Sequence, residues 1–128
     1  RRLSSLIEES ASRAVGIRAR AAAIVAAYCE VADEDWLTFS FHLTQIHRFI
    51  PYYQEDGRDP VTVTENVIKQ AMISAEIPPA DPRVLAAMAI GVITQTAQNR
   101  VYGRLGADPL SAHAGLMTAG VQALLFAR

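Results

Sequence analysis

The side chains that could carry out chemistry are few, and their spacing does not suit catalysis or metal binding. His42 and His47 are five residues apart, whereas two histidines that hold a metal ion from one helix face are four apart. Cys29 has no histidine at a spacing that would activate it, and the chain has no glycine-rich phosphate loop. Four carboxylates fall on the polar sides of their predicted helices: Glu8, Glu9, Glu65 and Glu76. The sequence therefore predicts no enzyme, no metal site and no cofactor.

The composition is typical of one globular domain. The chain has 128 residues, 51% of them hydrophobic, and a formal net charge of -1. This balance argues against a nucleic-acid-binding surface, which normally carries clustered Lys and Arg. The single cysteine fits a reducing compartment, and no apolar run approaches the roughly 20 residues that span a bilayer. We therefore expect one cytoplasmic domain over residues 1–128, with further sequence upstream because the chain does not begin with Met.

Apolar residues recur at helical spacing along the chain, and no stretch of useful length alternates as a strand would. The pattern predicts an all-α bundle of about six helices, over residues 3–14, 17–32, 36–50, 60–75, 82–104 and 109–128. Ser5 and Glu8 could begin the first helix as a capping box, or that helix could continue from upstream sequence. The last three helices share one start signal, an Asp cap followed by Pro at the first helical position: Asp59-Pro60, Asp81-Pro82 and Asp108-Pro109.

The last two predicted helices lack ionic side chains. No Asp, Glu, Lys or Arg occurs between Arg83 and Arg100, or from Pro109 to Ala127. Apolar residues point in every direction around both helices, and many small residues lie among them, which suits closely packed helix axes. A small domain cannot bury both helices on all sides by itself. One of them could be the central helix of a monomeric bundle, but two such helices favour burial against a second copy.

We therefore predict an obligate homodimer, in which the last two helices of each copy form an intermolecular four-helix bundle. Its interface should bury roughly 2,000 Å² or more. The residues expected at the interface are Ala86, Ile90, Ile93, Ala97, Leu116, Gly120, Ala123 and Leu124.

This layout resembles the C-terminal regulatory domain of the TetR family of transcriptional regulators. The resemblance depends on the segment from Asp81-Pro82 to Gly91, the long helix through Arg100 and Arg104, and the final apolar helix after Asp108-Pro109. The resemblance implies that the last two helices form the dimer bundle and that the preceding helices enclose an effector pocket. The helix-turn-helix that reads operator DNA in this family has no counterpart in the chain. DNA would therefore be a partner only through an N-terminal domain that lies upstream.

An effector pocket in such a bundle would be mostly apolar with a few polar anchors. The candidate lining residues are Tyr28, Trp36, Phe39, Leu43, His47, Met72, Gln95 and Asn99. Aromatic and Met residues at this spacing are more often ordinary core, and His47 on an apolar stripe is more often a hydrogen-bonded core residue. Thr64 and Thr94 are polar groups on otherwise apolar surfaces, so they would bond across the dimer seam or face the pocket.

These observations lead to one functional expectation and one alternative. The expectation is a ligand-sensing and dimerisation domain of a TetR-like repressor, in which a small hydrophobic or aromatic effector changes the spacing of two DNA-binding heads. The alternative is a structural dimerisation module that has no ligand pocket.

Overall fold

The computed structural model describes the backbone of residues 2–53 and 59–128 and the side chains of residues 3–45 and 59–128. These residues form six α-helices and one short 3-10 helix, and they contain no strand, which confirms the all-α prediction. The elements in order are α1 (Arg2–Arg13), α2 (Ile17–Glu34), α3 (Trp36–Tyr53), α4 (Pro60–Ile73), α5 (Pro82–Val101), η1 (Leu110–His113) and α6 (Ala114–Phe126).

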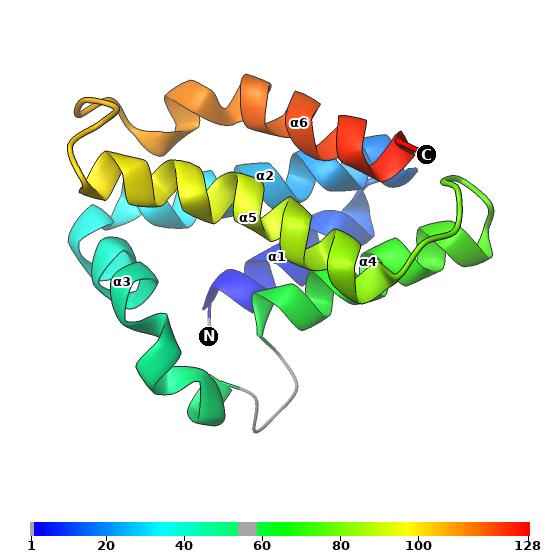
Figure 1. Cartoon of the computed structure of the whole chain (residues 1–128), viewed down its shortest axis with the longest axis horizontal. Helices are drawn as coiled ribbons and strands as arrows, with labels where there is room; N and C mark the ends of the chain where they lie inside the picture. The colour runs from blue at the N-terminus through cyan, green and yellow to red at the C-terminus, as the bar shows by residue number, and fades with distance from the viewer. Residues whose placement is uncertain (1, 54–58) are drawn as a thin grey trace.

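The most central helix of the bundle is α2, not one of the two uncharged helices. It contacts α1, α3, α4, η1 and α6, whereas α5 contacts α3, α4 and α6. Helices α5 and α6 lie side by side and run in opposite directions along one side of the molecule, and α3 extends away from the other helices at its C-terminal end (Figure 1). The uncharged pair is therefore peripheral, and neither member is the central helix of a monomeric bundle.

Aliphatic and small residues from every helix form one core. The largest fully buried side chains of this core are those of Ile7, Val25, Thr64, Ile68, Ile93 and Leu110. Alanines on α2 and α5, such as Ala21, Ala32, Ala86 and Ala97, are also buried and allow the helices to approach closely. Thr64 is 2% exposed, as its place on the apolar stripe of its helix predicts.

Two of the three expected Asp caps are present. The Asp59 carboxylate accepts the Thr62 N–H at 2.9 Å, and the Asp81 carboxylate accepts the Arg83 N–H at 3.0 Å. Each carboxylate thus satisfies an amide of the first turn of its helix, with Pro at the first helical position.

The third expected cap is wrong, because the segment after Pro109 begins as the 3-10 helix η1 and α6 starts only at Ala114. Asp108 makes no capping bond there; the Leu110 N–H donates instead to Asp33 Oδ1 at 2.9 Å. An acidic residue at the end of α2 therefore anchors the start of the last helical segment. The capping box at Ser5 is also wrong, because α1 already includes Ser5 and is helical from Arg2.

A tight turn joins α1 to α2, and one side chain from α2 and one from a distant loop stabilise it. Gly16 has a φ of 87°, a conformation that favours glycine. The Arg20 Nε donates to the carbonyl oxygens of Ala11 and Ala14, both at 3.3 Å, which satisfies groups at the end of α1. The Ile17 N–H donates to Glu76 Oε1 at 2.8 Å, which satisfies an amide at the start of α2.

None of the helices, as far as the structure describes them, is both long enough and apolar enough to cross a membrane.

Candidate functional site

Three of the predicted effector-site residues meet in an aromatic cluster at the junction of α2 and α3. The Phe39 ring lies 6.5 Å from the Tyr28 ring, edge to face, and 5.8 Å from the Trp36 ring in a stacked arrangement. The Arg100 guanidinium lies 4.0 Å from the centroid of the Trp36 indole. Tyr28 and Phe39 are buried in the core. The cluster therefore joins α2, α3 and α5 by packed rings and a cation–π contact.

The other predicted effector-site residues are distributed over α3, α4 and α5. Leu43 is half-buried on α3, whereas Met72 lies near the C-terminal end of α4, at the opposite end of the bundle (Figure 1). Gln95 is exposed on α5 and Asn99 is partly exposed one turn later. The side chain of His47 lies outside the described residues. The structure thus brings together the aromatic members of the predicted set and places Met72 away from them.

A small internal cavity lies elsewhere, where four helices meet. Its volume is about 10 Å³, which is room for about one water-sized group. None of the seven described members of the predicted effector site lines it. The lining residues come from α2 (Ile17, Ala21, Ile24), α4 (Thr64, Val67, Ile68), α5 (Ala89, Ile93) and α6 (Val121, Leu125).

Thr64 gives this cavity its one unusual feature. Its Oγ1 is buried and has no hydrogen-bond partner, which no other buried side-chain polar atom shares among the residues that the structure describes. The helical threonines Thr44, Thr94 and Thr96 each donate to a carbonyl oxygen four residues earlier, at 3.1, 3.1 and 2.6 Å. Thr64 makes no such bond. Thr94 was expected to bond across the dimer seam or to face the pocket. Its hydroxyl instead has a partner in its own helix, the Ile90 carbonyl oxygen.

The titratable groups inside the fold are held in their neutral forms. Burial, together with the nearby Asp59 carboxylate, raises the pKa of Tyr28 well above its ordinary value. Burial and the Asp33 carboxylate raise the pKa of Cys29 to about 11. Both groups therefore stay protonated at neutral pH, so neither is a ready nucleophile or base. Among the described residues, no three His, Cys, Asp or Glu side chains lie close enough together to hold a metal ion.

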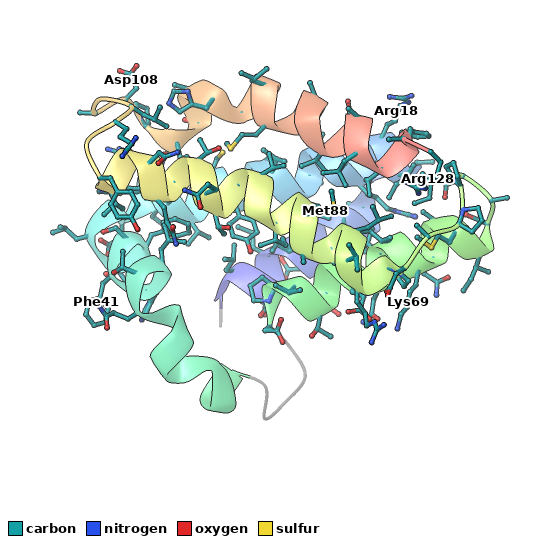
Figure 2. The ribbon with its side chains drawn as sticks, in the orientation of Figure 1. Arg18, Phe41, Lys69, Met88, Asp108 and Arg128 are labelled. Carbon is teal, nitrogen blue, oxygen red and sulfur yellow. The ribbon has the colours of Figure 1, made fainter. Side chains whose placement is uncertain are left out.

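The outer face of α5 and α6 exposes large apolar side chains. The exposed fraction is 53% for Val84, 52% for Met88 and 81% for Leu116. The alanines Ala87, Ala119 and Ala123 are exposed on the same two helices. Figure 2 shows Met88 near the middle of this side, with Arg18 and Arg128 near the C-terminal end of α6 and Asp108 at the other end. Arg18, Arg128 and Asp108 thus lie near the ends of the α5 and α6 pair, and the sequence has no ionic residue between Arg83 and Arg100 or from Pro109 to Ala127.

Only half of the predicted interface residues are accessible from this outer face. Ala86, Ile90, Ile93 and Ala97 have exposed fractions of 6% or less, because they pack against other helices of the same chain. On α6, Leu116 and Ala123 are exposed, while Gly120 and Leu124 are partly buried. The predicted α5 residues share one side of the helix, but it is the inner side. The outer side of α5 carries Val84, Ala87, Met88, Gly91 and Gln95.

Two glycines on the same two helices have no role inside the chain. A Cβ atom built on Gly91 or Gly115 would meet nothing within 4 Å. Glycine inside a helix costs about 1 kcal/mol relative to alanine. The fold itself would therefore accept alanine at both positions, and the absence of a side chain there needs an explanation outside the chain. Small residues among apolar ones are visible in the sequence, but the sequence could not show which glycines face outward.

Comparisons with known proteins give no relative for this chain. A scan against protein-family models finds no match, and searches of curated proteins and of solved structures find none either.

Proposed function

We propose that this chain is the dimerisation and effector-binding domain of a TetR-like transcriptional regulator. The support is its order of elements, with four helices followed by an adjacent antiparallel pair that lacks charge along its outer face. In this proposal the effector favours one arrangement of the helices and so resets the distance between two DNA-reading heads. Those heads are supplied by sequence upstream of Arg1.

The observation that carries the homodimer is the uncharged outer face of α5 and α6. It exposes Val84, Met88 and Leu116 and contains two glycines that the fold does not require. Large apolar side chains that are exposed on one pair of helices are typical of an interaction surface. Because it holds no ionic group along its centre, a second copy can cover it without like-charge repulsion, and a charged partner would find no counter-ion there.

The dimer is tested with two leucines that are equally exposed. Leu116 on α6 and Leu37 on α3 each have 81% of their surface exposed, and both lie in the first turn of a helix. We expect Leu116→Glu to produce a monomer in analytical ultracentrifugation at micromolar concentration, because it places a charge in an apolar interface. Leu37→Glu, outside the face, should sediment as the wild-type dimer does. A monomeric wild-type chain, or equal behaviour of the two variants, contradicts the proposal.

The regulator assignment is tested by the residues encoded immediately upstream of Arg1. A helix-turn-helix there supports it, and a protein extended to include those residues should bind its operator as a dimer. Upstream sequence without such a motif contradicts the regulator and leaves only the dimerisation module.

One observation favours the alternative, a structural dimerisation module without a pocket. The cavity of about 10 Å³ is far smaller than the several hundred Å³ of an ordinary ligand pocket. A thermal-shift screen with hydrophobic small molecules separates the two functions, because a ligand that binds only the folded state raises Tm. A compound that raises Tm with saturation supports effector binding, and a screen without any such compound supports the structural module.

A further inference from the structure

The two ends of the segment formed by η1 and α6 carry charges of opposite sign, and its beginning is the acidic end. Asp108 is exposed just before η1, and the Leu110 N–H donates to Asp33 Oδ1 at 2.9 Å, so the acidic end of α2 lies beside it. Arg100, at the same end, lies against the Trp36 ring at 4.0 Å from its centroid. The described ionic residues here are mostly acidic: Asp33, Glu34, Asp35 and Asp108 against Arg100 and Arg104.

The C-terminal end of α6 is the basic end. The Arg18 guanidinium lies 4.1 Å from the centroid of the Phe126 ring, and Arg128 donates to the Pro78 carbonyl oxygen at 2.7 Å. Both arginines are exposed, and Figure 2 shows them near this end of α6. The acidic residue of the neighbouring loop, Glu76, has both carboxylate oxygens engaged in hydrogen bonds within the chain. These contacts hold two positive charges beside one end of the α5 and α6 pair.

The apolar side chains between these ends do not by themselves fix how a second copy lies on them. Val84, Met88 and Leu116 are exposed there, and the burial of apolar surface has no preferred direction. A twofold axis allows the α6 helices of two copies to run parallel or antiparallel. The parallel arrangement places each charged end beside the same end of the partner, whereas the antiparallel one places the acidic end beside the basic end. Electrostatic complementarity therefore favours the antiparallel arrangement.

We propose that two copies of this chain pack through α5 and α6 with their α6 helices antiparallel, so that the Asp108 end of one copy lies over the Arg18 and Arg128 end of the other. This inference rests on the homodimer proposed above and adds the orientation of its subunits. Twofold symmetry repeats the charge contact at both ends of the interface. Exposed charges at the rim of an interface determine orientation and salt dependence more than affinity. The orientation also fixes the relative positions of the two α1 helices, and with them the spacing of the heads in the proposed regulator.

Cysteine cross-linking tests the orientation. Ala112 and Ala127 are exposed and lie near the beginning and the end of the segment formed by η1 and α6. The native Cys29 does not interfere, because it is 3% exposed and burial raises its pKa to about 11. We expect Ala112→Cys and Ala127→Cys each to give little cross-linked dimer alone with a short bismaleimide. An equimolar mixture of the two, after exchange of subunits, should give a cross-linked pair with one copy of each, which mass spectrometry identifies.

Charge reversal tests the contact between the ends. In sedimentation equilibrium at low salt, Arg18→Glu and Asp108→Arg should each raise the dimer dissociation constant on the order of tenfold, because each places like charges together at both ends. The double variant should recover most of this loss, since it restores opposite charges with their signs exchanged. These differences should shrink at about 1 M salt, where the Debye length is about 3 Å. The control is Lys69→Glu, which reverses an exposed charge on α4 and should leave the dissociation constant unchanged.

Three results overturn this orientation: a single-cysteine variant that cross-links to itself as efficiently as the mixture does, a mixture that gives no mixed product, or a double charge variant that dimerises more weakly than both single ones. Circular dichroism checks that each variant is folded. Sedimentation of the wild type separates this inference from the proposed function. A monomeric wild type contradicts the homodimer itself, whereas a dimer that gives any of the three results contradicts the antiparallel arrangement alone.

Discussion

The backbone N–H of Ile17 donates a hydrogen bond to Oε1 of Glu76 at 2.8 Å, although the two residues are 59 positions apart. The second carboxylate oxygen of Glu76 accepts the Ser74 hydroxyl at 2.9 Å. Glu76 therefore performs for α2 the role that a capping side chain next to the helix would normally perform. It holds the loop after α4 against the turn between α1 and α2, which also adjoins the cavity through Ile17.

Glu76 is expected to make stability depend on pH. The hydrogen bonds from Ser74 and Ile17 lower the pKa of the Glu76 carboxyl from its ordinary value of 4.5. A group whose pKa is lower in the folded state stabilises the fold above its unfolded pKa, and this contribution disappears as pH falls through the folded value. Glu76→Gln should therefore lower Tm at pH 7, and the difference from wild type should shrink as pH falls from about 4.5 toward 3.

The control for this prediction is Glu30→Gln, a change at an exposed residue of α2. Its Tm difference from wild type should be small at every pH. A Tm difference for Glu76→Gln that stays constant from pH 7 to pH 3 would show that the carboxylate charge does not contribute.

Thr64→Val is expected to stabilise the protein by about 1 kcal/mol, because it removes an unsatisfied buried hydroxyl and keeps the shape of the side chain. Thr64→Ala should instead destabilise it, since a buried methyl-sized group is lost beside an existing cavity. Urea unfolding monitored by circular dichroism measures both changes. If Thr64→Val lowers the free energy of unfolding, the hydroxyl has a partner in the folded protein.

Ala75 adopts a backbone conformation that favours glycine. Its φ is 63°, and the Glu76 N–H closes the turn by donating to the Ala71 carbonyl at 2.8 Å, as in the common glycine-containing end of a helix. Ala75→Gly is expected to raise the free energy of unfolding by roughly 0.5–1 kcal/mol in urea unfolding. Ala80→Gly, in the same loop but without a positive φ, should lower it slightly through the entropy of the unfolded chain. Equal effects of the two changes would contradict strain at Ala75.

Local sequence signals predicted most of the fold. The Asp59 and Asp81 caps, the six helices and the buried position of Thr64 follow from residue type and spacing within one segment. The bond from Leu110 to Asp33 could not be predicted in this way, because it joins residues 77 positions apart. The contact of Arg100 with Trp36 joins two separate helices and leaves no local pattern either.

Which side of α5 is buried and which is exposed could not be predicted either, for a different reason. Amphipathic helices reveal their buried side by the position of their charges. Between Arg83 and Arg100 there are none, so Ile90 and Met88 are equally plausible as interface residues from sequence alone. Packing decides the question, because Ile90 is 6% exposed and Met88 is 52% exposed. Met72 was wrongly grouped with the aromatic residues for a related reason. Helical spacing shows that it lies on the apolar stripe of α4, but not that the end of α4 that carries it is far from the aromatic cluster.

Gly91→Ala should stabilise each protomer and weaken the dimer. Because an added Cβ meets nothing within 4 Å in the chain, alanine should gain about 1 kcal/mol of helix propensity. If a partner helix packs closely against Gly91, the same methyl group pushes the two helices apart, and overpacking at such a contact typically costs 1–3 kcal/mol. Sedimentation equilibrium should therefore show a higher dimer dissociation constant, while the unfolding of protein diluted to the monomer shifts to higher urea. Ala26→Ser, at an exposed position of α2, should change neither quantity appreciably. A variant that is both more stable and equally dimeric would place Gly91 outside the interface and leave its glycine unexplained.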